Sequence, residues 1–506
     1  MRLAQQHLDR LTGIDASFLH QETAAAHMHI GGVLVFEGPA PTLKELTNHI
    51  ACRLHRIPRY RQRLAFPPLD TGRPLWIDDT SFNLDYHVRA SALPEPGNDA
   101  QLMDLVSRID SQPLDRSKPL WECYVISGIA PEPDGHAEKR FALIIKTHHA
   151  LVDGVSGVDL ATVLFDLTAE PPAPELEASE PWRPHPEPTP AQLVVAGLSN
   201  TLERATGLAV RAATAAAQPN RSLGLVRDAL EGVGEIAWAA LNPAPPTPLN
   251  VAIGPHRRYV VIRQRLADYR LIKATLGGTV NDVVLSVVAG ALAGWLRSRL
   301  VKTEGLELRA LVPVSIRPEG QRDALGNQLT LMRGPLPVYV EDPVARLAVV
   351  RAAMNGLKES NQALGAATIA SMNDLAPPAI LAQASRMQFS TRLFNLLVTN
   401  VPGPQFPLYV LGRKLHDMFP LAFLPANHAL AVAIMSYDGR IEWGLLGDYD
   451  AMHDIDVIAG GIESSLEELL QAARRTDARR RTRHQASGAA NGASAASASK
   501  AQHKST

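Results

Sequence analysis

Cysteine is nearly absent from this chain. Only Cys52 and Cys123 occur among 506 residues, so the fold cannot depend on a framework of disulfides. A cysteine-based metal cluster is excluded for the same reason. Such scarcity is typical of proteins that work in a reducing compartment.

Long uninterrupted hydrophobic runs are also missing. The longest candidate, Val283–Leu296, is shorter than the ~20 residues that cross a bilayer, and it predicts a core helix. Residues 1–15 alternate between polar and apolar types and lack the apolar stretch of a signal peptide. We therefore expect any contact with a membrane to be made from its surface.

An excess of charge of one sign is absent too. The formal net charge is −1 at pH 7, which argues against general attraction to nucleic acid. Hydrophobic residues make up 46 % of the chain, enough for sizeable cores. The length predicts two to three domains.

Composition divides the chain into four parts. We predict an N-terminal lobe over residues 1–170, a proline-rich linker with crossover helices over 171–256, and a C-terminal lobe over 257–472. The tail over 473–506 is first basic and then rich in alanine and serine, and we predict that it is disordered.

Two hairpins are indicated by turn chemistry between apolar runs. Pro131–Gly135 separates predicted strands near 121–127 and 140–147. Asp438-Gly439 separates predicted strands at 430–437 and 441–446.

The most informative stretch lies at the end of one of these strands. Residues 141–145 are apolar and partly β-branched, which predicts a buried strand, and apolar residues between 160 and 167 recur at helical spacing. His148 and His149 therefore stand where a strand ends, and Asp153 stands where a helix begins. Such junctions commonly present reacting groups in α/β folds.

General base catalysis is the chemistry that fits this pair of histidines best. Metal binding is the natural rival, but adjacent residues at a strand end point to opposite faces, and no ligand cluster lies nearby in the sequence. A nucleophilic triad fits poorly, because no Gly-x-Ser-x-Gly elbow occurs. A neutral imidazole near pH 7 is well matched to removing a proton from a hydroxyl group.

The segment His148–Gly154 matches the His-His-x-x-x-Asp-Gly signature of the CoA-dependent acyltransferase superfamily. Further segments occur in an order that resembles the bacterial wax ester synthase/diacylglycerol acyltransferase family. They are Leu11–Leu19, Met28–Gly32, Pro119–Glu122, Pro248–Asn250, Gly254–Arg258, Asn281-Asp282, Val314–Arg317, Gly326-Asn327 and Thr399–Pro404.

This resemblance implies an α/β fold of two chloramphenicol-acetyltransferase-like lobes, each a mixed sheet flanked by helices, with the active-site tunnel between them. It implies that His149 is the base, and that it deprotonates the hydroxyl of diacylglycerol or a fatty alcohol. The product would be triacylglycerol or a wax ester. Long-chain acyl-CoA would be the co-substrate, with no resident cofactor, metal or nucleic acid. The implied location is cytoplasmic, peripheral at the inner membrane face or at lipid inclusions.

The resemblance also implies supporting roles for the neighbours of His149. We expect Asp153 to form a structural ion pair, with Arg317 as the first candidate partner. His148 is expected to pack behind the loop, and Gly154 to serve the turn.

Two further polar residues, Asn281 and Asp282, have two possible roles. They could assist at the acceptor or oxyanion site, or they could cap the N-terminus of a helix.

Two alternative functions also stay open: acylation of a hydroxylated secondary metabolite or complex lipid, and lipid-droplet binding with little catalysis.

Overall fold

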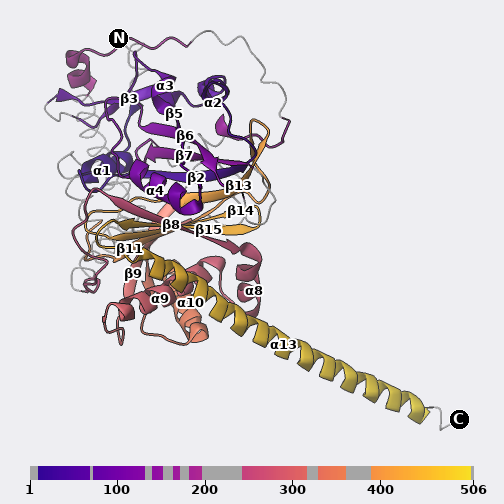
Figure 1. The fold of residues 1–506 in the computed structure, drawn as a ribbon. Coiled ribbons are helices and arrows are strands. Elements are labelled where there is room, and N and C mark those ends of the chain that lie inside the picture. Colours follow the sequence, from indigo (N-terminus) through magenta and orange to yellow (C-terminus); the bar gives the residue numbers. More distant parts are fainter. Residues whose placement is uncertain are drawn as a thin grey trace, which may run out of the picture.

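The computed structural model describes residues 9–68, 72–131, 139–151, 163–170, 182–196, 242–315, 329–359 and 389–502. Two six-stranded sheets dominate this part of the chain (Figure 1). A small third sheet and several short helical elements complete the N-terminal side. They are β1 Asp9–Arg10, β3 Gln62–Ala65, β4 Leu75–Asp78, α3 Leu84–His87, η2 Leu54–Arg56 and η3 Pro58–Arg61.

The N-terminal sheet has the strand order β12-β13-β2-β7-β6-β5. Strands β6 and β7 form the predicted antiparallel hairpin, and only β5 runs parallel to its neighbour. The strands are β2 His29–Glu37, β5 Val88–Ala92, β6 Trp121–Ile129, β7 Arg140–His148, β12 Tyr409–Val410 and β13 Arg413–Leu421. Helices α1 Gly13–Gln21, α2 Leu43–Ala51 and α4 Asp99–Asp110 accompany this sheet.

The C-terminal sheet has the order β10-β9-β11-β14-β15-β8 and is also mixed, because β11 runs parallel to both neighbours. Strands β14 and β15 form the second predicted hairpin, and both turn residues, Asp438 and Gly439, have positive φ. The strands are β8 Arg257–Arg265, β9 Leu308–Ser315, β10 Leu329–Leu336, β11 Leu396–Pro402, β14 Leu430–Tyr437 and β15 Arg440–Asp448.

Alternation along the strands separates two kinds of apolar surface. In β14, Val432 and Ile434 face a core made with the C-terminal helices, whereas Ala431 and Ala433 face the other lobe. That second face joins a cluster to which both lobes contribute, including Phe18. The two lobes are therefore fused by a common apolar interface.

One strand crosses from the C-terminal part of the chain into the N-terminal sheet. β13 pairs with β2, so residues 413–421 complete a sheet whose other large strands come from residues 29–148. The predicted boundary at residue 256 assigned residues 413–421 to the C-terminal lobe, and the pairing of β13 with the N-terminal sheet was not part of that prediction. Gly444 of β15 permits the approach of β13, because a Cβ there would lie 2.0 Å from the Pro420 carbonyl oxygen.

Helices cover the outer face of the C-terminal sheet (Figure 1): α8 Leu266–Leu276, α9 Val280–Ser298, α10 Pro343–Glu359 and α13 Ile455–Gln502. α9 is long and apolar enough to cross a membrane by composition, but most of it is buried against its neighbours. The predicted disordered tail differs from the structure, where α13 continues to Gln502 and projects from the body (Figure 1). Alanine and arginine favour helix, and extending a formed helix needs no new nucleus.

Candidate active site

His149 follows the last residue of β7, as the sequence predicts. Its backbone N–H donates to the Met28 carbonyl oxygen at 2.8 Å, which ties the strand end to the segment that precedes β2. The ring stacks on Phe18 of α1, with centroids 3.8 Å apart and planes 15° apart. Phe423 contacts it edge-on at 5.7 Å. His149 therefore lies in the apolar interface between the lobes.

These apolar surroundings set the protonation state of His149. Burial lowers its pKa to about 4, and a hydrogen bond to its own backbone carbonyl opposes this shift without cancelling it. Nδ1 is buried and has no hydrogen-bond partner in another described residue. The imidazole is consequently neutral at pH 7 and able to accept a proton.

His148 turns to a different set of neighbours. Its Nδ1 accepts a hydrogen bond from the Ala150 N–H at 3.0 Å, so a neutral ring carries its proton on Nε2. Nε2 lies 3.4 Å from a carboxylate oxygen of Glu22. The His148 N–H donates to the Leu120 carbonyl oxygen at 3.0 Å, which gives the Pro119–Glu122 motif a structural role. His148 therefore packs behind His149.

Glu22 is the main residue that the sequence did not reveal. Burial alone would raise its pKa, but hydrogen bonding and charge from His148 and Arg116 outweigh burial and lower that pKa to about 2. The Arg116 Nε donates to Glu22 at 2.8 Å. Glu22 is thus an ionised carboxylate beside His148. Its only sequence signal is its position just after α1, four residues beyond Phe18.

More buried polar groups lie behind this pair. The rings of His27 and His29 stack with centroids 5.2 Å apart, and burial lowers the pKa of both. Lys146 is also buried, and its Nζ donates to the carbonyl oxygens of Ile109 and Gln112 at 3.0 and 2.9 Å. These bonds hold the end of β7 against the end of α4.

Asp282 caps a helix, one of its two predicted roles. Its carboxylate accepts the Thr279 N–H at 2.8 Å, and its own N–H donates to Thr279 Oγ1 at 3.2 Å. This is a capping box at the start of α9. Asn281 is half-buried in the same turn, and no described contact joins it to His149.

Asp153, Gly154 and Arg317 lie outside the described residues, so their predicted roles stay predictions. Within the described ranges, no group of three histidine, cysteine or acidic residues is placed to hold a metal ion. Burial raises the pKa of the Cys123 thiol to about 12, so this cysteine does not supply a nucleophilic thiolate.

Comparison with known proteins gives a consistent assignment. Residues 11–284 match the model of the wax ester synthase/diacylglycerol acyltransferase catalytic domain, and residues 325–470 match the C-terminal domain of that family. A probable diacylglycerol O-acyltransferase of Mycobacterium tuberculosis is 32 % identical over 486 residues, which cover 94 % of this chain and 98 % of that protein. A second probable diacylglycerol O-acyltransferase of the same species is 32 % identical over 472 residues, covering 92 % and 99 %.

Solved structures agree. The wax ester synthase/diacylglycerol acyltransferase of Marinobacter aquaeolei VT8 matches with a TM-score of 0.64 at 26 % identity, covering 92 % of this chain and 99 % of that one. A trichothecene 15-O-acetyltransferase of Fusarium sporotrichioides matches with a TM-score of 0.56 at 12 % identity, covering 91 % and 95 %, which supports the fold alone. The predicted α/β fold, acyltransferase class and family are confirmed: the chain belongs to the wax ester synthase/diacylglycerol acyltransferase family.

Proposed function

We propose that this acyltransferase moves a long-chain acyl group from acyl-CoA to the hydroxyl of diacylglycerol or a fatty alcohol, with His149 as general base. One observation carries the assignment of the base. His149 ends β7 in an apolar interface that keeps its imidazole neutral, with a pKa of about 4. The same interface is compatible with two hydrocarbon chains that meet in a tunnel between the lobes.

The reaction needs one proton transfer and one displacement. The acceptor hydroxyl gives its proton to Nε2 of His149 as its oxygen attacks the thioester carbonyl carbon. The tetrahedral intermediate then collapses, the C–S bond breaks, and the CoA thiolate recovers the proton from the imidazolium. No acyl-enzyme is required, in keeping with the buried Cys123 thiol.

A low pKa makes His149 a weak base in the free enzyme, but the charge that develops during the reaction makes its protonation more favourable. Negative charge develops on the substrate oxygen as the proton leaves, and in an apolar site that charge stabilises the imidazolium strongly. Glu22 contributes behind His148, where its ionised carboxylate helps to hold the histidine pair in place.

An acceptor panel with one labelled acyl-CoA tests this proposal. Labelled ester formed from hexadecanol or diacylglycerol, with matching release of CoA thiol, supports it. Ester formed only with another hydroxyl compound, such as a secondary metabolite or complex lipid, contradicts the acceptor assignment. Lipid binding without thiol release contradicts catalysis.

We also propose that the protein works from the cytoplasm at the surface of a membrane or lipid inclusion. Its acceptors are water-insoluble, and Arg474, Arg475, Arg479 and Arg480 are exposed where α13 leaves the body. Sedimentation with phosphatidylglycerol vesicles, but not with phosphatidylcholine vesicles, is the expected result. If the protein sediments with neither kind of vesicle, the proposal is contradicted.

A further inference from the structure

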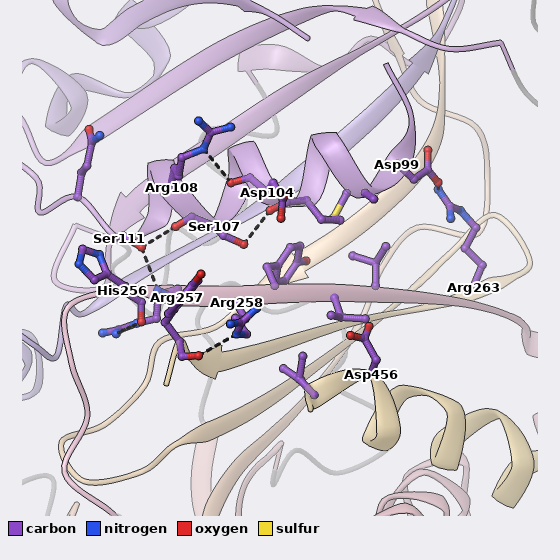
Figure 2. A pocket seen from close by; sticks show the side chains of 18 residues that line it. Asp99, Asp104, Ser107, Arg108, Ser111, His256, Arg257, Arg258, Arg263 and Asp456 are labelled. Atoms are coloured by element: carbon purple, nitrogen blue, oxygen red, sulfur yellow. Dashed lines mark hydrogen bonds and ion pairs between the residues drawn. The ribbon is translucent and has the colours of Figure 1, made fainter. Parts of the chain in front are cut away.

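A groove of about 930 Å³ runs between α4 and β8, along the seam where the two lobes meet (Figure 2). We call it the α4–β8 groove. Arg108 of α4 and Ser111 form part of one wall. His256, Arg257 and Arg258, from the start of β8, form part of the other. A ligand in this groove would therefore contact both lobes.

One end of the groove is basic and has unused hydrogen-bond donors. The Arg258 Nε donates to the Tyr449 carbonyl oxygen at 2.8 Å, but its two terminal nitrogens have no hydrogen-bond partner among the described residues. Arg108 is exposed, and its Nε makes one long bond of 3.4 Å to the Asp104 carbonyl oxygen. Guanidinium donors that are free and face a groove suit phosphate oxygens.

An aromatic ring lies beside these donors. The Arg258 guanidinium lies 4.0 Å from the centre of the Tyr449 ring, and 45 % of Tyr449 is exposed. The lining of the groove also includes the apolar residues Met103, Val260 and Val261. A stacked aromatic and arginine beside an apolar floor suit a planar heterocyclic base.

The acidic residues of the groove do not cancel its basic end. Asp99 is paired with Arg263 at 3.0 Å, at the opposite end of the groove (Figure 2). Asp456 also lies toward that end, at the start of α13 (Figure 2). Among the described residues that line the groove, Asp104 is the carboxylate that lies near Arg108, and it is exposed.

The groove is also connected to the catalytic loop through Arg257. The Arg257 N–H donates to Ser111 Oγ at 3.0 Å, and its guanidinium donates to the Ala25 carbonyl oxygen. Ala25 is three residues from Met28, whose carbonyl oxygen accepts the His149 N–H. Three residues of chain span at most about 10 Å, so the wall of the groove is close to the base.

We propose that the α4–β8 groove binds the nucleotide end of acyl-CoA. Arg108 and Arg258 contact the phosphates, and the adenine lies against Tyr449, so the thioester arm is directed toward His149. This assignment rests on the proposed function for its choice of donor. A phospholipid headgroup shares the phosphate but lacks the base, and the test separates the two.

Binding is measured by calorimetry on the full-length protein, with adenosine 3′,5′-bisphosphate and desulfo-CoA as probes. We expect Arg258→Gln and Arg108→Gln each to weaken binding about tenfold, since each removes a charge-assisted contact. Asp104→Asn should tighten binding a few-fold. Arg56→Gln, at an exposed arginine far from the groove lining, is the matched control and should not change it.

Kinetics give a second, independent readout. The two arginine variants should raise KM for acyl-CoA about tenfold and leave kcat nearly unchanged. With the acyl thioester of N-acetylcysteamine, which lacks the nucleotide, they should match the wild type. If the two substitutions lower kcat/KM equally with acyl-CoA and with the N-acetylcysteamine thioester, the proposal is overturned, because the arginines would then not act by contacting the nucleotide.

The outcomes separate this inference from the proposed function. Acyl transfer from acyl-CoA that is insensitive to both arginine substitutions refutes the groove assignment and leaves the function intact. Arginine-dependent binding of the bisphosphate without any acyl transfer supports the groove and refutes the function. Binding of phosphatidylglycerol vesicles through these arginines, without binding of the bisphosphate, refutes the nucleotide assignment.

Discussion

At the scale of single residues, the aromatic rings around His149 place the proposed base in apolar surroundings, where burial lowers its pKa. His149 follows from a short local motif at the end of a strand. Phe18 and Phe423 reach it from segments far away in the chain, and only the packed lobes bring these rings together. The motif predicts which group reacts, whereas the packing of the two lobes lowers the pKa of that group.

Removing the base tests its role directly. His149→Ala should lower kcat by about 10²–10⁴-fold with either acceptor, which is the usual contribution of a general base. CoA thiol release measures the effect. An unchanged melting temperature and unchanged binding of desulfo-CoA serve as controls. Activity within a few-fold of the wild type would show that another group accepts the proton.

We predict that Phe18, which stacks on His149, sets the pH dependence of the reaction. Because the pKa of His149 is lowered to about 4, wild-type kcat/KM should persist well below pH 6.5 and fall as the pH approaches 4. Phe18→Ala admits water to the imidazole, so its pKa rises toward 6.5 and the acidic limb moves up by about one to two pH units.

Phe18→Leu is the matched control, because it removes the ring but keeps an apolar cover. Its acidic limb should stay near that of the wild type. Measurement of kcat/KM against pH for the three proteins decides the matter. An unchanged limb in Phe18→Ala would mean that burial by Phe18 does not set the pKa.

Glu22 tests the support behind the histidine pair. Glu22→Gln keeps the shape but removes the charge that faces His148 and Arg116, and it should lower kcat about tenfold with a small change in KM. Folded-state stability should also fall above pH 4.5. This carboxylate has a lowered pKa of about 2, so its contribution is present above 4.5 and is lost as the pH falls toward 2.

At the scale of elements, hairpins could be predicted and long-range pairing could not. The β14–β15 hairpin follows from Asp438-Gly439, because the turn that joins its strands is local. The pairing of β13 with β2 joins strands at opposite ends of the sequence. No local pattern specifies that partner, so the exchange of β13 between lobes could only come from tertiary structure.

A buried charge network fastens β13 to the C-terminal sheet. Asp417 is fully buried and accepts hydrogen bonds from Arg263 at 3.0 Å and Arg440 at 2.9 Å. Although burial opposes ionisation, His416 and Arg263 hold the pKa of Asp417 well below its usual range. Glu442 accepts the Met418 N–H in the same region, and burial raises its pKa well above normal.

Asp417→Asn should therefore weaken the attachment of β13 to the C-terminal sheet and lower the free energy of unfolding. Breaking a buried ion pair from one side typically costs ~3–5 kcal/mol, because the arginines are left without their partner. Urea unfolding measures the loss. Glu463→Gln, at an exposed site on α13, is the control and should change stability little. A loss below about 1 kcal/mol for Asp417→Asn would show that the network does not fasten the strand.

At the scale of the whole molecule, burial of histidine couples stability to pH. In the part of the chain that the structure describes, six histidines have a lowered pKa: His27, His29, His49, His87, His149 and His428. Desolvation is the largest cause for each of them. The unfolded chain regains a histidine pKa near 6.5, so below that pH it binds more protons than the folded chain.

Stability should consequently be complete above pH 6.5 and fall as the pH drops through 6 and 5. Each histidine that stays neutral in the folded state costs about 1.4 kcal/mol per pH unit below 6.5. Asp110 opposes this trend, because burial raises its pKa to about 6 and its folded form keeps a proton. Burial also raises the pKa of Glu442, which acts in the same direction as Asp110. Six histidines outweigh these two carboxylates, so the net effect is destabilisation in acid.

Urea midpoints measured between pH 7.5 and pH 5 test this coupling. His87→Gln removes one of the buried histidines, whose Nδ1–H donates to the Trp121 carbonyl oxygen at 2.7 Å. This substitution should reduce the pH dependence of the free energy of unfolding by about one bound proton. His55→Gln removes an exposed histidine and should leave the slope unchanged. A wild-type midpoint that stays constant from pH 7 to pH 5 would contradict the coupling. Such a result would mean that the six buried histidines take up protons in the folded chain as they do in the unfolded chain.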